Sequence, residues 1–340
     1  MRLEVSEASV GYGAHTVLGG VGFALARGEI GCLLGPSAAG KTTLLRAIAG
    51  FEALQRGRIE ADDETLAAPG VHVPPERRRI GMVFQDHALL PHLSAFDNVR
   101  FGLFAQSRRD AAARAMAMLE LVGLAASAQR YPHELSGGQQ QRIALARALA
   151  PQPRLVLLDE PFSSLDQDLR ERLARDVRAA LKQAGVGALL VTHSQPEAFA
   201  MSDVIGVIGE GRLQQWGTAQ DLYQRPASRF VAGFIGDGVL LAARGIGDGR
   251  AQCALGELEL RDARLGDALN VLVRPHDVVP DAAGTPAVVI ERSFRGDVFV
   301  CTLRLDDGTQ VQTLLPVRDA PAPGEPIRVR LAAHEPVAFG

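Results

Sequence analysis

The sequence predicts an α/β domain with a largely parallel sheet, followed by a smaller all-β domain. Two observations predict the first domain: short apolar runs bounded by turn residues recur along it, and helical segments separate these runs. A third observation predicts the second domain, because beyond about Gly236 short alternating segments follow one another between Gly- and Asp-rich turns. The 340 residues are enough for two cores.

In the first domain, three apolar runs are expected to be buried strands: "EIGCLLG", "RLVLLDE" and "GALLVTH". The first leads through a Gly-rich turn into the helix "KTTLLRAIAG". Residues 88–153 are rich in Ala, Leu and Arg, and we expect a helical insertion there. A later amphipathic helix is expected to end near Gly185, with one apolar face formed by Leu169, Leu173, Val177 and Leu181.

The second domain is predicted to be a small β-barrel or sandwich over residues 237–340, after a first domain at 1–236. Its expected strands include "ALNVLVRP", "PAVVIERSF", "VFVCTLRL" and "PIRVRLA".

Composition limits the classes of partner and compartment. The net charge of −3 lacks the basic excess of a nucleic-acid-binding protein, so no nucleic-acid partner is expected. No run of eighteen apolar residues and no export signal are present, so we expect no membrane span. Three scattered cysteines form neither a metal spacing nor a disulfide framework, which favours a reduced cytosolic compartment.

The strongest motif is "GPSAAGKT", which fits the P-loop pattern completely between a strand and a helix. Backbone N–H groups of such a loop hold phosphate oxygens, Lys41 would reach the β- and γ-phosphates, and Thr42 would bind Mg²⁺. An ordinary Gly-rich turn is the alternative, but it does not explain the Lys-Thr pair. The expected nucleotide-binding residues here are Gly35, Pro36, Ser37, Ala38, Ala39, Gly40, Lys41, Thr42 and Thr43.

Two adjacent carboxylates end the strand "RLVLLDE". Asp159 is a candidate Mg²⁺ ligand, and Glu160 could polarise the water that attacks the γ-phosphate. By themselves they would be an acidic turn, but after a P-loop they indicate an NTPase. Gln85 and His193 also end apolar strands, and neither indicates catalysis by itself.

The motifs, in this order, resemble those of the ATPase subunit of an ABC transporter, over residues 1 to about 235. Tyr12 in "VGYGAH" matches the aromatic residue that stacks on adenine, and Gln85 matches the Q-loop glutamine. "LSGGQ" is similar to the signature, "SSLD" with Asp166 to the D-loop, and His193 to the switch histidine. The resemblance implies a RecA-like core that uses ATP and Mg²⁺, with Thr42, Gln85 and Asp159 around the metal and Glu160, His193 and Gln85 in catalysis.

The resemblance also explains why a second phosphate-binding stretch lies at "LSGGQQQR". In this family two copies pack head to tail, and each signature closes over the ATP of its partner. Ser136, Gly137, Gly138 and Gln139 would then meet the γ-phosphate of the second copy, at the start of a helix from Gln139. A plain helix cap is the alternative role of "SGG", and both roles are compatible. Two departures from the family pattern are Ser194, where many importer subunits have Asp, and Ser164.

Transport requires a partner. The resemblance implies integral-membrane permease subunits, an external binding protein acting indirectly, and a location on the cytoplasmic face of the plasma membrane. The segment "DHALLPHLSAFDNVRFGL" after Gln85 would receive the permease, although core packing is the alternative for Leu89, Leu93 and Phe101.

Cargo is suggested only by overall likeness. "VLVRPHDV" resembles the small β-barrel appended to importer ATPases, and "LYQRPASRFVAGFIGDGVLL" and "GDGRAQCALGELEL" resemble the ferric-iron importers most. Polyamine, sugar and phosphonate import stay open. A non-transport ABC ATPase is disfavoured by the single P-loop, the single signature and the short insertion. A metabolite-sensing role of the β-domain lacks a visible ligand constellation.

Overall fold

The computed structural model describes residues 1–13, 15–163, 167–260, 268–332 and 336–340, without the side chains of 167–169. It forms two compact units, Met1–Ala219 and Gln220–Gly340. The predicted boundary at residue 236 lies inside the second unit, because the short helix α9 (Arg229–Phe234) groups with the β-strands that follow it. No helix in the described ranges is both long and apolar enough to cross a membrane.

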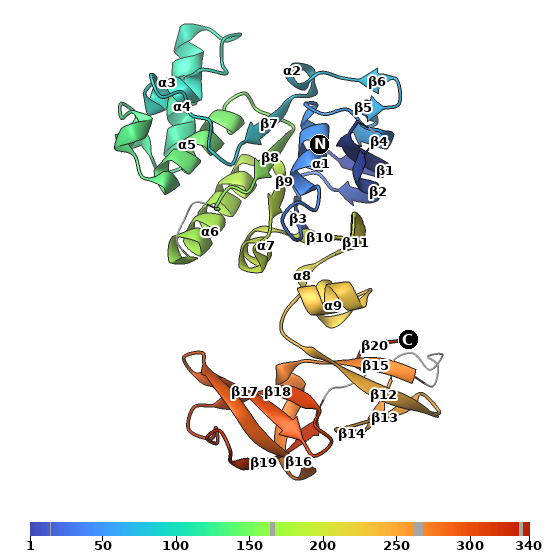
Figure 1. Cartoon of the computed structure of the whole chain (residues 1–340). Helices are drawn as coiled ribbons and strands as arrows, with labels where there is room; N and C mark the ends of the chain where they lie inside the picture. Colours follow the sequence, from blue (N-terminus) through green and yellow to red (C-terminus); the bar gives the residue numbers. More distant parts are fainter. Residues whose placement is uncertain (14, 164–166, 261–267, 333–335) are drawn as a thin grey trace. The chain divides into compact units, whose positions relative to one another are not determined.

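The first unit is built on a six-stranded sheet of order β11-β10-β3-β9-β8-β7, shown in Figure 1. Five strands are parallel, and β11 pairs antiparallel at the edge. The three predicted strands lie at its centre and are buried throughout, which confirms the prediction from their apolar runs. The bounds are β3 Ile30–Leu34, β7 Ile80–Val83, β8 Leu155–Asp159, β9 Gly187–Thr192, β10 Val204–Gly209 and β11 Arg212–Gly217.

A second, antiparallel sheet of order β2-β1-β4-β5-β6 was not predicted. Its buried side chains share one core with α1 (Lys41–Ala49) and the central sheet, so both sheets support the same helix. Its strands are β1 Leu3–Tyr12, β2 His15–Leu25, β4 Arg56–Ala61, β5 Glu64–Ala68 and β6 Val71–His72, and the short helix α2 (Pro75–Arg78) follows.

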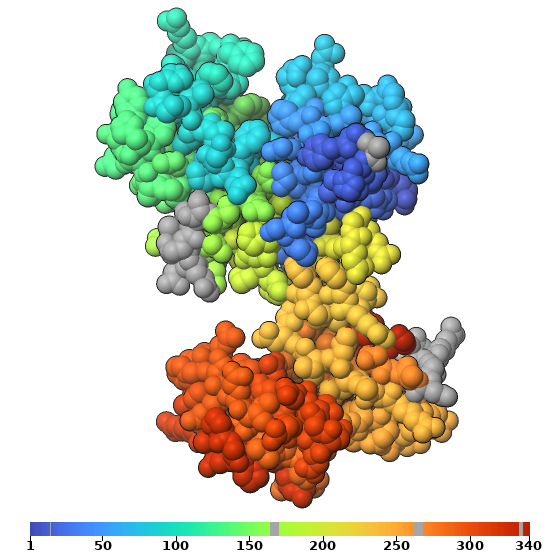
Figure 2. All heavy atoms as spheres, viewed as in Figure 1, coloured from blue at the N-terminus to red at the C-terminus, as the bar shows by residue number. Residues whose placement is uncertain are grey.

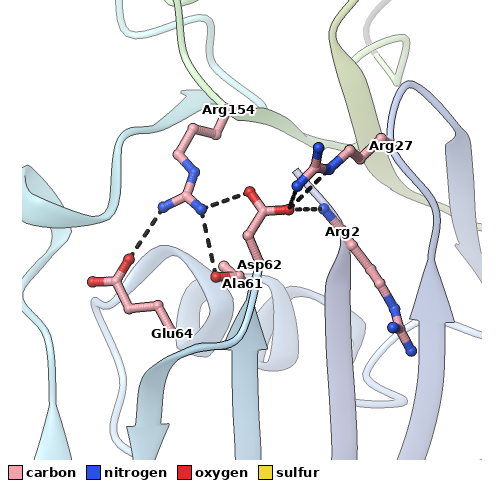
Figure 3. A network of polar contacts seen from close by, with 6 residues as sticks. All are labelled: Arg2, Arg27, Ala61, Asp62, Glu64 and Arg154. Atoms are coloured by element: carbon pink, nitrogen blue, oxygen red, sulfur yellow. Dashed lines mark hydrogen bonds and ion pairs between the residues drawn. The ribbon is translucent and has the colours of Figure 1, made fainter.

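A network of charged side chains joins this second sheet to β8 (Figure 3). Asp62, in the turn after β4, accepts a 2.6 Å hydrogen bond from Arg154, which precedes β8. Arg154 also pairs with Glu64 at 3.1 Å, and Asp62 accepts from the backbone N–H of Arg2 and from Arg27. The hydrogen bond from Arg154 holds the pKa of Asp62 far below its usual range. The network therefore anchors the start of the strand whose opposite end carries the predicted acidic pair.

The expected helical insertion is present as a separate lobe (Figure 1). It contains α3 (Ala95–Arg100), α4 (Arg108–Leu121) and α5 (Gly137–Leu149). Each of these helices begins after a serine whose hydroxyl accepts a backbone N–H of the first turn. The helix expected from Gln139 starts two residues earlier, at Gly137, because this capping arrangement includes both glycines.

The amphipathic helix α6 (Gln167–Ala184) buries Leu173, Val177 and Leu181, while the side chain of Leu169 lies outside the description. It ends as predicted, since Gly185 adopts a left-handed φ of 66°. Helix α7 (Gln195–Met201) packs against it.

The second unit contains two antiparallel sheets around one apolar core, in agreement with the all-β prediction. The predicted strands appear as β15 (Ala268–Val273), β16 (Val278–Phe294), β17 (Val298–Leu305) and β19 (Pro326–Leu331). The remaining strands are β12 Val239–Gly247, β13 Arg250–Cys253, β14 Gly256–Glu259, β18 Gln310–Pro316 and β20 Ala338–Phe339.

Arg274 attaches α9 and the segment around it to the β-strands of this unit. Its guanidinium is nearly fully buried and donates to the backbone oxygens of Ala232, Asp237 and Tyr223 at 3.0–3.2 Å. It also lies 4.4 Å from the centre of the Tyr223 ring. Burial lowers the pKa of Arg274.

Replacing Arg274 by Met should destabilise the second unit by about 3 kcal/mol, because several buried carbonyls lose a charged donor. Urea unfolding of the full chain would measure this change. The exposed Arg304 on β17 provides the control, since Arg304→Met should change stability by less than about 0.5 kcal/mol. Equal effects of the two substitutions would contradict the anchoring role.

Candidate functional site

The P-loop connects β3 to α1 through backbone conformations that the motif requires. Ala38 and Gly40 adopt left-handed φ values of 62° and 88°. At Gly35, a Cβ would lie 2.3 Å from the backbone oxygen of Ile208, so only glycine fits. Ala38 adopts a backbone conformation that glycine adopts more readily, and the loop forms nevertheless. Because the first turn of a helix leaves its N–H groups without intrahelical partners, the start of α1 can present these groups to an anion.

Lys41 lies inside this loop. Its Nζ donates to the backbone oxygens of Gly35 at 2.9 Å and Pro36 at 2.7 Å, and its side chain is almost fully buried. Burial lowers the pKa of Lys41, while the nearby carboxylates Glu160 and Asp159 raise it. The loop thus holds a cation where phosphate oxygens would bind.

Thr42 and Asp159 meet across the sheet edge, as their motifs predict. The Thr42 hydroxyl donates to Asp159 Oδ1 at 2.8 Å. Burial raises the pKa of Asp159, whereas the hydrogen bond from Thr42 and the charge of Arg46 lower it.

A cavity of about 710 Å³ opens beside this pair. It brings together the three oxygen-bearing side chains that were predicted around a metal, and hydroxyl, amide and carboxylate oxygens are the donors that Mg²⁺ prefers. The residues present therefore fit Mg²⁺. Sequence reasoning missed Arg46, which also reaches this cavity, because a helix interior position carries no motif signal. The lining residues are Thr42, Arg46, Phe84, Gln85, Asp86, Asp159 and Ser163.

Glu160 and His193 lie at the ends of neighbouring parallel strands, where such ends share one edge. His193 Nδ1 is 3.4 Å from Glu160 Oε2, and the imidazole is 49% exposed. Glu160 has a left-handed φ of 42°, and its backbone is held by Val191 and Ser163 at 3.0 Å each. The backbone of Glu160 is therefore fixed in a conformation that non-glycine residues adopt uncommonly.

Tyr12, at the end of β1, stands beside the P-loop helix. Its hydroxyl is 3.5 Å from Thr43 Oγ1, and 55% of the residue is exposed. The ring is therefore available to stack on a base.

The "LSGGQ" stretch forms a capping box at the start of α5. Ser136 Oγ accepts from Gln139 N at 3.4 Å, and Gln139 Oε1 accepts from Ser136 N at 3.0 Å. Within the described part of the chain, no hydrogen bond or ion pair joins 135–139 to the P-loop, and Figure 1 shows α5 in the helical lobe, apart from α1. The structure therefore brings Tyr12, Gln85, Asp159, Glu160 and His193 near the P-loop, whereas the signature lies elsewhere, with Ser136 and Gly137 exposed and Gly138 buried.

The predicted D-loop residue Asp166 and the first departure from the family pattern, Ser164, lie outside the described residues. The second departure, Ser194, is described. Ser194 caps α7, because its hydroxyl accepts from Glu197 N, and its own N–H donates to Thr192 Oγ1 at 3.0 Å. Serine thus performs the capping role that an aspartate could perform at this position.

Comparisons with known proteins agree with this geometry. A family model described as "ABC transporter" matches residues 18–163, and one described as "TOBE domain" matches residues 271–339. The chain is 42% identical to "Fe(3+) ions import ATP-binding protein FbpC 2" of Rhodococcus jostii, over 97% of this chain and 96% of that protein. It is 40% identical to a protein named "Fe(3+) ions import ATP-binding protein FbpC" in Streptomyces coelicolor, over 99% and 97% of the two chains. An equally named protein of Pseudomonas fluorescens is 40% identical over 98% and 96%.

Proposed function

The chain belongs to the ATP-binding proteins of ABC transporters, and from this premise we propose that it hydrolyses ATP to power ferric-iron import through a separate permease. The observation that supports this cargo is likeness over nearly the full length, including the β-rich second unit, to proteins named for Fe(3+) import.

Hydrolysis is assigned to Glu160 and His193, which directly follow the neighbouring strands β8 and β9. Glu160 polarises the attacking water, and His193 contacts the γ-phosphate. The 3.4 Å distance between His193 Nδ1 and Glu160 Oε2 supports a shared role for the two side chains. Tyr12 stacks on adenine beside α1. Most of the rate acceleration comes from positioning and electrostatics, as phosphoryl transfer generally requires.

Binding of the phosphates is assigned to the P-loop. Residues 35–43 hold the phosphate oxygens, and Lys41 offsets their charge. Thr42, Gln85 and Asp159 would hold Mg²⁺, which neutralises charge that develops on the phosphates.

The position of the signature in the helical lobe, with Ser136 and Gly137 exposed, supports a head-to-tail homodimer. Ser136, Gly137, Gly138 and Gln139 of one copy close over the ATP of the other, together with Asp166, and one two-fold axis creates both sites. ATP binding closes this dimer, and hydrolysis opens it. The backbone N–H groups of Gly137 and Gly138 at the start of α5 would meet the γ-phosphate, while that of Gln139 is held by Ser136 Oγ.

Binding of the permease is assigned to the segment after Gln85. This segment reaches the surface of the first unit as a cyan-to-turquoise band in Figure 2. Phe101 and Phe104 are 62% and 92% exposed, so the core-packing alternative is wrong for Phe101. Leu89 and Leu93 are half-buried. Exposed aromatic side chains on one segment are typical of a protein interface. This docking would place the chain on the cytoplasmic face of the plasma membrane, with an external binding protein beyond the permease.

Charge reversal at the exposed Asp86 should weaken permease binding about tenfold or more, because like charges across an interface are costly. ATP affinity should change less. Co-purification with the permease and nucleotide titration would measure the two effects. Asp306→Lys, on an exposed turn of the second unit, is the charge-matched control and should leave both unchanged. Normal permease recovery with Asp86→Lys would remove this surface from the proposal.

Cargo is tested by uptake of labelled ferric iron in cells that lack this chain, complemented with wild type or Glu160→Gln. Uptake restored by wild type alone would support both the cargo and the catalytic residue. Uptake independent of the chain would overturn the cargo, and labelled polyamines, sugars and phosphonates would be tested next.

A further inference from the structure

Glu197 on α7 is a buried carboxylate with no part in the mechanism above. It is 3% exposed, and each carboxylate oxygen has a partner. Oε2 accepts a hydrogen bond from the Thr192 hydroxyl, and Oε1 lies 3.3 Å from Arg170 Nε. Burial raises the pKa of Glu197, and these two contacts lower it. A buried carboxylate is costly unless its neighbours stabilise it, and here Thr192 and Arg170 do so.

Glu197 is linked to the residues before and after His193 in the chain. Thr192 Oγ1 donates to Glu197 and also accepts from the N–H of Ser194 at 3.0 Å. Ser194 Oγ in turn accepts from the backbone N–H of Glu197 at 3.5 Å. The residues before and after His193 are therefore tied to the same glutamate, while the imidazole itself stays half-exposed beside Glu160.

Arg170 holds the other side of this carboxylate. It lies near the start of α6, four positions after Asp166, and α6 packs against α7. Arg170 thus connects the beginning of α6 to the short segment 192–194 through Glu197.

We propose that Glu197 is a positioning residue: through Thr192 and Ser194 it fixes the imidazole of His193 where it contacts the γ-phosphate, and Arg170 keeps Glu197 in place. The inference rests on the proposed function, because it requires that His193 acts in ATP hydrolysis. A carboxylate that only stabilised α7 would affect folding, and its removal would not depend on whether His193 is present.

The test is a double-mutant cycle on the full chain, with Thr192→Val and His193→Ala singly and together. Valine keeps the shape of threonine but removes the hydroxyl that makes both contacts. Thr192→Val should lower kcat on the order of 10- to 100-fold, because small misplacements of a catalytic group have effects of this size. ATP affinity should stay within about twofold, and Thr192→Ser, which keeps the hydroxyl, should restore most of kcat. In the His193→Ala background, Thr192→Val should lower kcat no further.

Asp203→Asn is the matched control, because Asp203 pairs with Arg178 and Lys182 on the same helix α6 at 2.6 and 2.7 Å. It should lower the melting temperature and leave kcat within about twofold. Glu197→Gln tests the same positioning role at the carboxylate itself. If that variant does not fold, the Val and Ser substitutions of Thr192 still test whether Glu197 positions His193.

Two results would overturn the inference. One is a normal kcat with Thr192→Val, and the other is a loss that multiplies with the loss from His193→Ala. If His193→Ala itself hydrolyses ATP normally, the assigned role of His193 fails together with the inference. If His193→Ala is inactive and Thr192→Val is not, only the positioning role fails.

Discussion

Replacing Glu160 by Gln should lower kcat for ATP hydrolysis by about 10³-fold, because an amide cannot polarise the attacking water as a carboxylate can. ATP binding should persist, since the P-loop contacts of Lys41 and Thr42 do not involve this side chain. With hydrolysis blocked, the closed homodimer should accumulate on addition of ATP. Steady-state turnover, nucleotide titration and size-exclusion chromatography would measure the three effects.

Glu210→Gln is the matched control, because Glu210 is exposed and also has a left-handed backbone. It should hydrolyse ATP at the normal rate. Near-normal turnover of Glu160→Gln would remove Glu160 from the mechanism, whereas loss of ATP binding would assign it to substrate binding instead.

Mixing two inactive variants should restore ATP hydrolysis if the signature acts on the partner's ATP. Lys41→Met loses the phosphate contact, and Ser136→Arg places a bulky side chain at the start of α5, so each homodimer should be inactive. A mixed dimer contains one site with both parts intact. Because about half of the dimers in an equal mixture are mixed, the rate should reach up to about a quarter of the wild-type rate.

If the signature acted within its own chain, each chain in the mixture would carry a defective site and the activity would stay at background. The control is a mixture of Lys41→Met with Glu160→Gln. Both substitutions damage the P-loop side of the site, so no mixed dimer has an intact site and no activity should return. Recovery in this control would show that subunit complementation does not report on the signature.

The sequence predicted most of the first unit's central architecture, because buried parallel strands have a composition that surface elements do not share. The strand ends then determined the site, since Asp159, Glu160 and His193 all follow apolar runs and parallel strands end at one edge. The antiparallel sheet at the N-terminus was missed. Its strands alternate buried and exposed residues irregularly, with register shifts between β1 and both of its neighbours.

Contacts between distant side chains were also beyond sequence reasoning. Arg154 meets Asp62 across ninety-two positions, and Arg170 meets Glu197 from a different helix. Neither pair has a fixed spacing, so no motif could identify it. The sequence did not decide whether Phe101 lies in the core or on the surface, because an aromatic side chain can occupy either position.

The position of Lys41 has a consequence for how selective the loop is. Its ammonium has three N–H donors, and two of them already have acceptors, the backbone oxygens of Gly35 and Pro36, so one phosphate oxygen can be added and any further oxygen enters by exchange. The net free energy of binding is then the difference between two sets of hydrogen bonds, and neutral oxygens gain almost nothing from the replacement. Only acceptors that carry negative charge exceed the internal ones by a useful margin. The loop's own carbonyls thus compete with an incoming oxygen, and charged polyphosphate oxygens displace them more readily than the neutral oxygens of sugars or water do.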